Sequence, residues 1–192
     1  MKNIEKYHIL LGSKSPRRRE LLQMMRIPFN VVTISGVEET YPYTMPPREV
    51  PLYLSGIKAD AYLPHLRDNE LIITADTLVI LGDKILGKPH SHEDAMATLR
   101  SLSGKTHQVV TGVTIATRER RTSFSSVTDV TFDQLTDEEI RYYVDNFNPM
   151  DKAGAYGIQE WIGGAAVEKI DGSFYNVMGL PIQRLYKELQ IF

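Results

Sequence analysis

The sequence predicts an α/β protein with a mixed sheet flanked by helices, arranged as two lobes around a central cleft. Apolar runs of strand length are interleaved along the chain with segments of helical periodicity, which is the pattern of this fold class. No internal repeat, low-complexity tract or long Gly/Ser linker divides the 192 residues. We therefore expect a single domain spanning residues 1–192, long enough to bury roughly 70% of its unfolded-chain surface without disulfides.

The first third of the chain predicts a strand, a loop, a helix and a second strand. An apolar run at 7–11 stops at Gly12-Ser13, and Ser15-Pro16 then provides a helix N-cap with Pro at the first helical position. The helix places Leu21, Leu22 and Met25 on one face, and the second strand covers 29–33.

A Pro-rich passage at 41–51 is expected to be an exposed loop, followed by a helix with an apolar stripe of Val50, Leu54, Ile57 and Ala61. The next run, 71–75, predicts a buried strand that ends at Asp76-Thr77. Residues 78–86 then predict a hairpin that turns at Gly82-Asp83.

The remaining elements follow from caps and periodicity. Ser91 caps a helix that Gly104 ends, and the β-rich runs 107–117 and 122–132 predict a long antiparallel hairpin. Thr136 with Glu139 forms a capping box before a helical stripe, and the last helix begins near Pro181. Strands and helices are therefore interleaved, and the class is α/β or α+β with a mixed sheet.

Composition excludes several classes of protein. With 22 Lys plus Arg against 24 Asp plus Glu the net charge is −2, which argues against bulk nucleic-acid binding. The absence of Cys excludes a thiol nucleophile, a Cys-ligated zinc and an iron–sulfur cluster. The longest apolar stretches are about four residues, far below the ~20 of a membrane span. We expect a soluble, cytoplasmic protein with no membrane partner.

An anion site is predicted where the first helix begins. The N–H groups of a helix start carry partial positive charge, so Arg17, Arg18 and Arg19 in the first turn are locally unfavourable. A bound phosphate explains them, because N–H groups, the hydroxyls of Ser13 and Ser15 and the arginine forks then converge on one anion. The alternative is that some arginines face water or pair with an acidic neighbour, and consecutive helical residues cannot all face one ligand.

Carboxylates and lysines elsewhere complete a candidate phosphate and metal site. Asp76 at a strand end could bind a metal or accept a proton from water, or it could simply make a turn. Glu38 and Glu39 could supply oxygen ligands to Mg²⁺, although such pairs are often solvated. Lys58 and Lys88 could each neutralise a phosphate.

The segment 151–159 is rich in small residues and ends in Gln159, whose amide can pair with a base edge. A plain turn has a similar composition. Signatures of P-loop NTPases, serine hydrolases and zinc sites are absent from the sequence.

Taken together, an ordered set of motifs from about residue 8 to 185 resembles the Maf family of nucleoside triphosphate pyrophosphatases. This resemblance implies a Maf/ITPase-like fold. The motifs are Gly-Ser-Lys-Ser-Pro-Arg-Arg at 12–18, Glu-Glu at 38–39, Lys-Ala at 58–59, Ala-Asp-Thr at 75–77, Gly-Lys-Pro at 87–89, Ser-Gly-Lys-Thr-His at 103–107, Val-Thr-Gly at 110–112, Lys-Ala-Gly at 152–154, Tyr-Gly-Ile-Gln at 156–159, Val-Glu-Lys-Ile-Asp-Gly-Ser at 167–173 and Asn-Val-Met-Gly-Leu-Pro at 176–181.

The resemblance implies an often dimeric enzyme that hydrolyses a nucleotide between its α and β phosphates. It implies that Asp76 is the proton acceptor and that Arg17, Thr77 and Gln159 select the base. Tyr-Gly-Ile-Gln is similar to the branch that acts on dTTP and UTP. Two departures concern the shape of the base pocket: Glu160-Trp161 replaces small residues, and 164–166 lacks a Phe.

The expected function is thus metal-assisted hydrolysis of dTTP or UTP, with modified pyrimidine nucleotides as further candidates, to monophosphate and pyrophosphate. Mg²⁺ or Mn²⁺ would be held by substrate oxygens with Asp76, Glu38 and Glu39. Arg17, Arg18, Lys58 and Lys88 would stabilise the charge on the phosphates. The expected partners are this substrate and a second copy of the chain.

Three alternatives stay open. One is a pyrophosphatase for modified purine nucleotides, and a second is a non-catalytic nucleotide-binding regulator of cell division. The third, a nucleic-acid binder, depends on two clusters of arginine, at 17–19 and 118–121.

Overall fold

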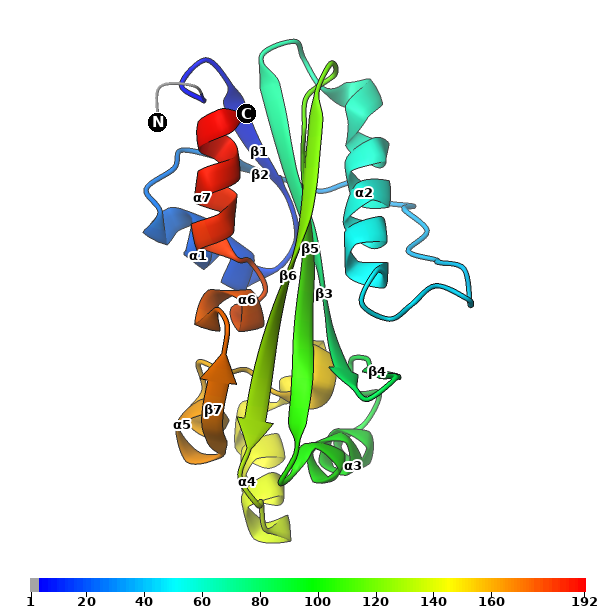
Figure 1. The fold of residues 1–192 in the computed structure, drawn as a ribbon, viewed down its shortest axis with the longest axis vertical. Coiled ribbons are helices and arrows are strands. Elements are labelled where there is room, and N and C mark those ends of the chain that lie inside the picture. Colours follow the sequence, from blue (N-terminus) through cyan, green and yellow to red (C-terminus); the bar gives the residue numbers. More distant parts are fainter. Residues whose placement is uncertain (1–3) are drawn as a thin grey trace. The chain divides into compact units, whose positions relative to one another are not determined.

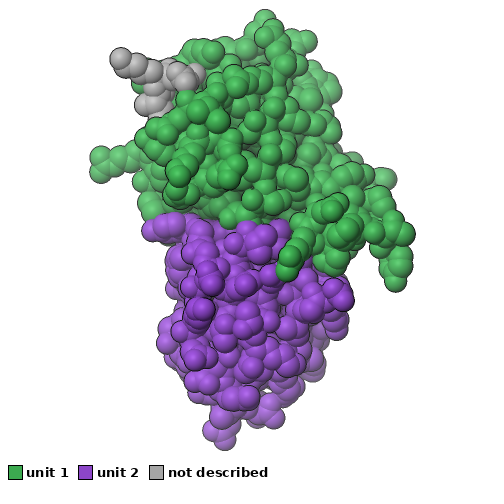
Figure 2. All heavy atoms as spheres, in the orientation of Figure 1, with its two compact units in different colours: residues 1–76, 111–126, 179–192 green, residues 77–110, 127–178 purple. Residues whose placement is uncertain are grey.

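The computed structural model describes residues 4–192 and contains a mixed seven-stranded sheet with helices (Figure 1). It divides into two compact units (Figure 2). Of the described residues, unit 1 comprises 4–76, 111–126 and 179–192, and unit 2 comprises 77–110 and 127–178. The predicted mixed α/β class is confirmed, whereas the central cleft stays a prediction.

The strands are β1 His8–Gly12, β2 Asn30–Val32, β3 Glu70–Leu81, β4 Lys84–Leu86, β5 Thr106–Ala116, β6 Arg121–Phe132 and β7 Val167–Asp171. The α-helices are α1 Pro16–Met24, α2 Val50–Tyr62, α3 His92–Leu102, α4 Asp137–Phe147, α5 Trp161–Ala165, α6 Phe174–Met178 and α7 Ile182–Ile191. Short 3₁₀ turns lie at Leu63–His65, Pro149–Asp151 and Ala153–Ala155. Within residues 4–192, no helix has the length and apolar character that crossing a membrane requires.

The sheet has the strand order β2-β1-β3-β5-β6-β7, with β4 paired to β3. β1 is parallel to both of its neighbours, with Leu10 opposite Asn30 on β2 and Ile72 on β3. β4 and β7 are antiparallel to β3 and β6. Both parallel and antiparallel pairs therefore occur, as the sequence predicts.

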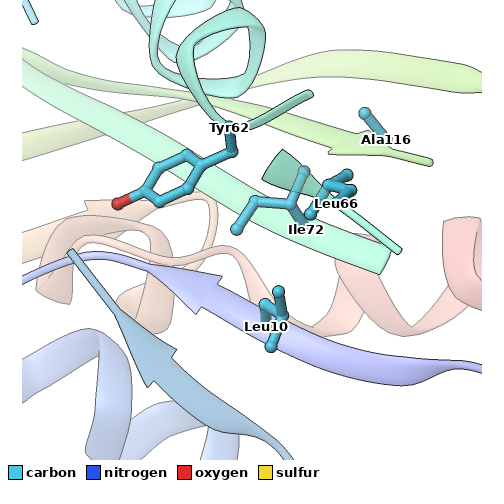
Figure 3. Packing of buried hydrophobic residues seen from close by; sticks show 5 residues of the cluster. All are labelled: Leu10, Tyr62, Leu66, Ile72 and Ala116. Atoms are coloured by element: carbon cyan, nitrogen blue, oxygen red, sulfur yellow. The ribbon is translucent and has the colours of Figure 1, made fainter. Parts of the chain in front are cut away.

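The core of unit 1 forms where α2 packs on the strands. Leu10, Tyr62, Leu66, Ile72 and Ala116 form one buried cluster (Figure 3). The Tyr62 ring lies inside this cluster while its hydroxyl donates to the carbonyl of Val32 at 3.1 Å, which satisfies the one polar atom that the ring carries. This packing fixes α2, the helix that carries Lys58, against β1 and β3.

The start of α2 lies directly against β5. A Cβ atom added to Gly112 would stand 2.3 Å from the backbone of Pro51 and Leu52. Only glycine permits this approach, so Gly112 of the Val-Thr-Gly motif has a packing role in unit 1.

Unit 2 is built on capped helices. The capping box of α4 is confirmed, since Thr136 and Glu139 exchange side-chain and backbone hydrogen bonds. Ser91 caps α3 through the N–H of Asp94, also as predicted. Asn176 on α6 donates to the Val109 carbonyl at 3.0 Å and so ties α6 to β5.

One sequence prediction about strand ends is wrong. β3 does not stop at Asp76-Thr77 but continues as a 12-residue strand to Leu81, where the predicted hairpin turns at Gly82. Asp76 can remain inside a strand because a lysine compensates its buried charge, as described below. The elements β7, α5 and α6 have no counterpart in the sequence prediction, because their segments are too short to show a period.

Candidate functional site

The helix start at α1 is organised by two serines. Ser15 is the N-cap of α1, and its Oγ accepts a hydrogen bond from the N–H of Arg18 at 3.4 Å. The N–H of Ser15 in turn donates to Oγ of Ser13 at 3.2 Å. The predicted cap is therefore confirmed. Both hydroxyls lie at the start of α1, where an anion would bind.

Arg18 reaches from this helix start to two other segments of unit 1. Its Nε donates to the carbonyl of Gly179 and its Nη1 to the carbonyl of Ala75, each at 2.8 Å. Burial lowers the pKa of the Arg18 guanidinium from its ordinary value, and the Asp76 carboxylate partly offsets this effect. Arg18 thus anchors the backbone next to Asp76, a role that the sequence pattern does not reveal.

Asp76 and Lys58 form a largely buried ion pair in unit 1. The Lys58 ammonium lies 2.6 Å from Oδ1 of Asp76 and 2.9 Å from Oε2 of Glu39. The side chain of Asp76 is 12% exposed and that of Lys58 16%, whereas Glu39 is 52% exposed. The structure therefore brings together three predicted site residues from β3, α2 and the loop before α2.

The carboxylates here suit a divalent cation whose remaining ligands come from the substrate. The carboxylates of Asp76 and Glu39 already converge on one positive charge, the Lys58 ammonium, and oxygen donors of this kind suit Mg²⁺ and Mn²⁺. Glu38 is exposed in the loop beside Glu39. No three His, Asp or Glu side chains within residues 4–192 are grouped as metal ligands by themselves. Mg²⁺ usually takes one or two carboxylates plus substrate phosphates, so the pair is consistent with such a site.

Three further predicted site residues, Thr77, Lys88 and Gln159, belong to unit 2. Thr77 is half-buried on β3, and Lys88 is exposed directly after β4. The preceding carbonyl, that of Gly87, accepts a hydrogen bond from Gly154 at 3.1 Å, which ties the Gly-Lys-Pro motif to the Lys-Ala-Gly motif. Gln159 is exposed in the turn between Gly157 and Glu160.

Sequence reasoning missed the side chains that surround this turn. Lys152 is buried and pairs with Glu160 at 3.2 Å, and Glu160 also accepts from the Tyr143 hydroxyl. The departure at Glu160 is the one signal in the sequence that pointed here. Its partners, 8 and 17 residues away, become visible only in the fold.

The arginines at the tip between β5 and β6 bind within unit 1. Arg118 pairs with Asp68 at 3.2 Å, and Arg121 pairs with Asp60. The guanidinium of Arg120 lies 4.8 Å from the centre of the Phe192 ring. These contacts give the arginines an intramolecular role, which weakens one of the two observations behind the nucleic-acid alternative.

His107 is held by a hydrogen bond and by aromatic packing. Its Nε2 lies 2.7 Å from the Tyr156 hydroxyl, and its ring packs edge-on against Phe132 and Tyr156. Burial lowers the pKa of His107 to about 4, so the ring is neutral near pH 7. It is therefore not a source of positive charge for a phosphate.

Comparison with known proteins gives one family match and several close relatives. The Maf-like protein family matches residues 8–192. A dTTP/UTP pyrophosphatase from Phocaeicola vulgatus is 56% identical over 99% of this chain and 98% of its own length. One from Parabacteroides distasonis is 53% identical over the whole of both chains. Among solved structures, the Staphylococcus aureus Ham1 protein is similar over 65% of this chain and 71% of its own, with 15% identity and a TM-score of 0.48.

Proposed function

Since the chain belongs to the Maf-like protein family, we propose that it is a nucleoside triphosphate pyrophosphatase that hydrolyses dTTP and UTP. Relatives at 53–56% identity carry the name dTTP/UTP pyrophosphatase, and the alignments cover nearly the full chain. The products are the nucleoside monophosphate and pyrophosphate. The observation that carries the proposal is the buried Asp76 carboxylate held beside Lys58 and Glu39.

Asp76 is the proposed proton acceptor. Water attacks the α-phosphorus, a new bond forms between the water oxygen and phosphorus, and the bond to the bridging oxygen of pyrophosphate breaks. The water proton passes to a carboxylate oxygen of Asp76, and the departing pyrophosphate takes the bond electrons. Lys58, 2.6 Å away, holds that carboxylate in place and compensates its charge.

Other side chains of the chain bind the nucleotide. Ser13, Ser15 and Arg17 at the start of α1 are proposed to bind phosphate oxygens, and Lys88 to neutralise the pyrophosphate. Thr77 and Gln159 are proposed to contact the base. Arg18 adds positive charge near the start of α1 and donates a hydrogen bond to the Ala75 carbonyl.

A divalent cation, Mg²⁺ or Mn²⁺, would be held by Asp76 with Glu39 and Glu38. When bound, it would supply positive charge at the phosphate oxygens and so weaken the bond to pyrophosphate. The donor set supports this assignment because two carboxylates already share one cationic group. Dialysis against EDTA is expected to abolish turnover, and added Mg²⁺ or Mn²⁺ to restore it.

The decisive experiment is a product assay. The protein is incubated with each common triphosphate and several modified ones, with and without Mg²⁺, and the monophosphate and pyrophosphate are identified by chromatography. We expect dTTP and UTP to be the best substrates. A preference for modified purine nucleotides, or stabilisation by dTTP without release of pyrophosphate, would replace the proposal by one of the two nucleotide alternatives.

The Asp76→Asn variant tests the assigned base. Loss of a proton acceptor is expected to lower kcat for dTTP by about 10²–10⁴-fold. Asp83→Asn is the matched control, because Asp83 is exposed at the hairpin turn after the same strand. If Asp76→Asn turned over dTTP at the rate of Asp83→Asn, the role of Asp76 would be refuted.

We further propose that the active protein is a cytoplasmic homodimer. Light scattering after size-exclusion chromatography tests the oligomeric state at the concentrations used in the assay. Fractionation of cells tests the location.

A further inference from the structure

The turn that presents Gln159 is closed by its own backbone. The N–H of Glu160 donates to the carbonyl of Gly157 at 3.0 Å, which places Gln159 at the third position of a four-residue turn. Ile158, at the second position, is buried, whereas Gln159 is exposed. The direction in which the Gln159 side chain leaves the backbone therefore depends on what holds the two ends of the turn.

One hydroxyl holds both ends. Tyr143 on α4 is fully buried, and its hydroxyl accepts from the N–H of Gly157 at 2.9 Å while donating to Oε2 of Glu160. Burial and the bond to the Glu160 carboxylate raise the pKa of Tyr143, so the hydroxyl keeps the proton that it donates. The first and last residues of the turn are thus joined through α4.

A buried ammonium completes the network. The Lys152 ammonium lies 3.2 Å from Oε1 of Glu160 and 2.8 Å from Oδ1 of Asp151, and the Lys152 side chain is 9% exposed. A Cβ atom on Gly157 would stand 2.9 Å from Cδ of Glu160 and 3.0 Å from Cε of Lys152. The network therefore packs directly against the turn, and a methyl group at Gly157 would displace Glu160 or Lys152.

Glu160 serves this network rather than the helix that follows it. It occupies the N-cap position of α5, but its side chain makes no cap hydrogen bond. A carboxylate at that position ordinarily accepts from the helix N–H groups. Here both carboxylate oxygens point to Tyr143 and Lys152 instead.

We propose that Glu160, held by Lys152 and Tyr143, is a positioning residue that sets base selectivity by fixing the Gln159 amide. This rests on the proposed function, in which Gln159 contacts the base. A displacement of about 1 Å in a substrate-positioning group can cost ~10²-fold in rate. Glu160→Gln keeps an acceptor for Tyr143 but removes the charge that faces Lys152, so we expect about a 10-fold loss of kcat/KM for dTTP, mainly through KM.

The experiment is a double-mutant cycle on selectivity. Wild type, Glu160→Gln, Gln159→Ala and the double variant are assayed with dTTP, dCTP and dGTP. If Glu160 acts through Gln159, both single variants reduce the preference for dTTP, and Glu160→Gln changes that preference less than about 2-fold when Gln159 is already Ala. Glu138→Gln, an exposed carboxylate on α4, is the control and keeps the wild-type preference.

Three results would overturn the proposal. Glu160→Gln could lower kcat/KM for all three nucleotides by one factor, its effect could be fully additive with Gln159→Ala, or it could leave the preference unchanged. If Glu160→Gln does not fold, Tyr143→Phe replaces it and must shift the preference in the same direction. If neither variant folds, the network serves the fold alone and the proposal fails.

The wild-type assay separates this proposal from the proposed function. A wild-type protein that releases no pyrophosphate from any nucleotide overturns both. An active wild type whose preference responds to Gln159→Ala but not to Glu160→Gln overturns only the positioning role.

Discussion

Replacing Lys58 by Met tests how unit 1 tolerates a buried carboxylate. The change removes the ammonium 2.6 Å from Asp76 and 2.9 Å from Glu39 while keeping a side chain of similar length. It leaves a carboxylate that is 12% exposed next to a second one, with the Arg18 guanidinium as the remaining cation that interacts with both. Breaking a buried ion pair by removing one partner costs about 3–5 kcal/mol.

The magnitude follows from the exposure of each pair. The contact with Glu39 is half exposed and contributes at most about 1 kcal/mol, as surface pairs do. The contact with Asp76 is nearly buried, and its slight exposure places the cost at the lower end of the range. We therefore expect Lys58→Met to lower the free energy of unfolding by about 3 kcal/mol.

Urea unfolding followed by circular dichroism measures this difference at neutral pH. The double variant Lys58→Met with Asp76→Asn no longer carries a carboxylate that has lost its ammonium partner, so it should be at least about 1 kcal/mol more stable than Lys58→Met alone. Lys187→Met, at an exposed lysine on α7, is the control and stays within about 0.5 kcal/mol of wild type. A Lys58→Met midpoint equal to that of the control would refute the reasoning.

Three further measurements test packing, burial and anchoring. Gly112→Ala forces a Cβ to 2.3 Å from the α2 backbone and should destabilise by about 3 kcal/mol in urea, whereas Gly56→Ala, in open space within α2, should stabilise by about 0.5–1 kcal/mol. The pKa of His107 is about 4 in the fold and 6.5 in the unfolded chain. Between pH 4 and 6.5 the unfolded state therefore binds a proton at this imidazole that the folded state does not bind. The stability that the neutral His107 contributes is therefore complete above pH 6.5 and is lost as pH falls towards 4. At pH 5 the free energy of unfolding is lower by about 2 kcal/mol, and urea titrations of His107→Phe should lack this loss. Arg18→Lys cannot keep both 2.8 Å bonds to the Gly179 and Ala75 carbonyls, so a drop of about 2 kcal/mol is expected by the same method.

Local signals in the sequence predicted the elements that local chemistry decides. The cap at Ser15 and the capping box of Thr136 with Glu139 depend on neighbours within three residues, and each is present as predicted. The hairpin at Gly82-Asp83 is likewise set by a turn residue with positive φ. Such features require no knowledge of the rest of the fold.

Features that depend on distant partners could not be predicted. Asp76 marks a strand end in the sequence pattern, yet β3 continues through it and pairs with β4, and Lys58, 18 residues earlier, compensates the buried carboxylate. The contact of Arg18 with Gly179 joins residues 161 apart. Composition and periodicity contain no information about pairs at such separations, because the register of the sheet decides which residues meet.

The arginines in the first turn of α1, Arg17 and Arg18, are unfavourable next to the helix dipole, and two different interactions can compensate their charge. Cations in the first turn of a helix oppose its dipole, and a phosphate ligand is one way to compensate them. Arg18 has another, since its guanidinium donates to two backbone carbonyls of unit 1 and faces the charge of Asp76. The repulsion at the helix start is therefore partly balanced before any ligand binds. The argument for an anion site consequently rests on Arg17 and the serine hydroxyls, while Arg18 links that helix start to the strand position just before the proposed base.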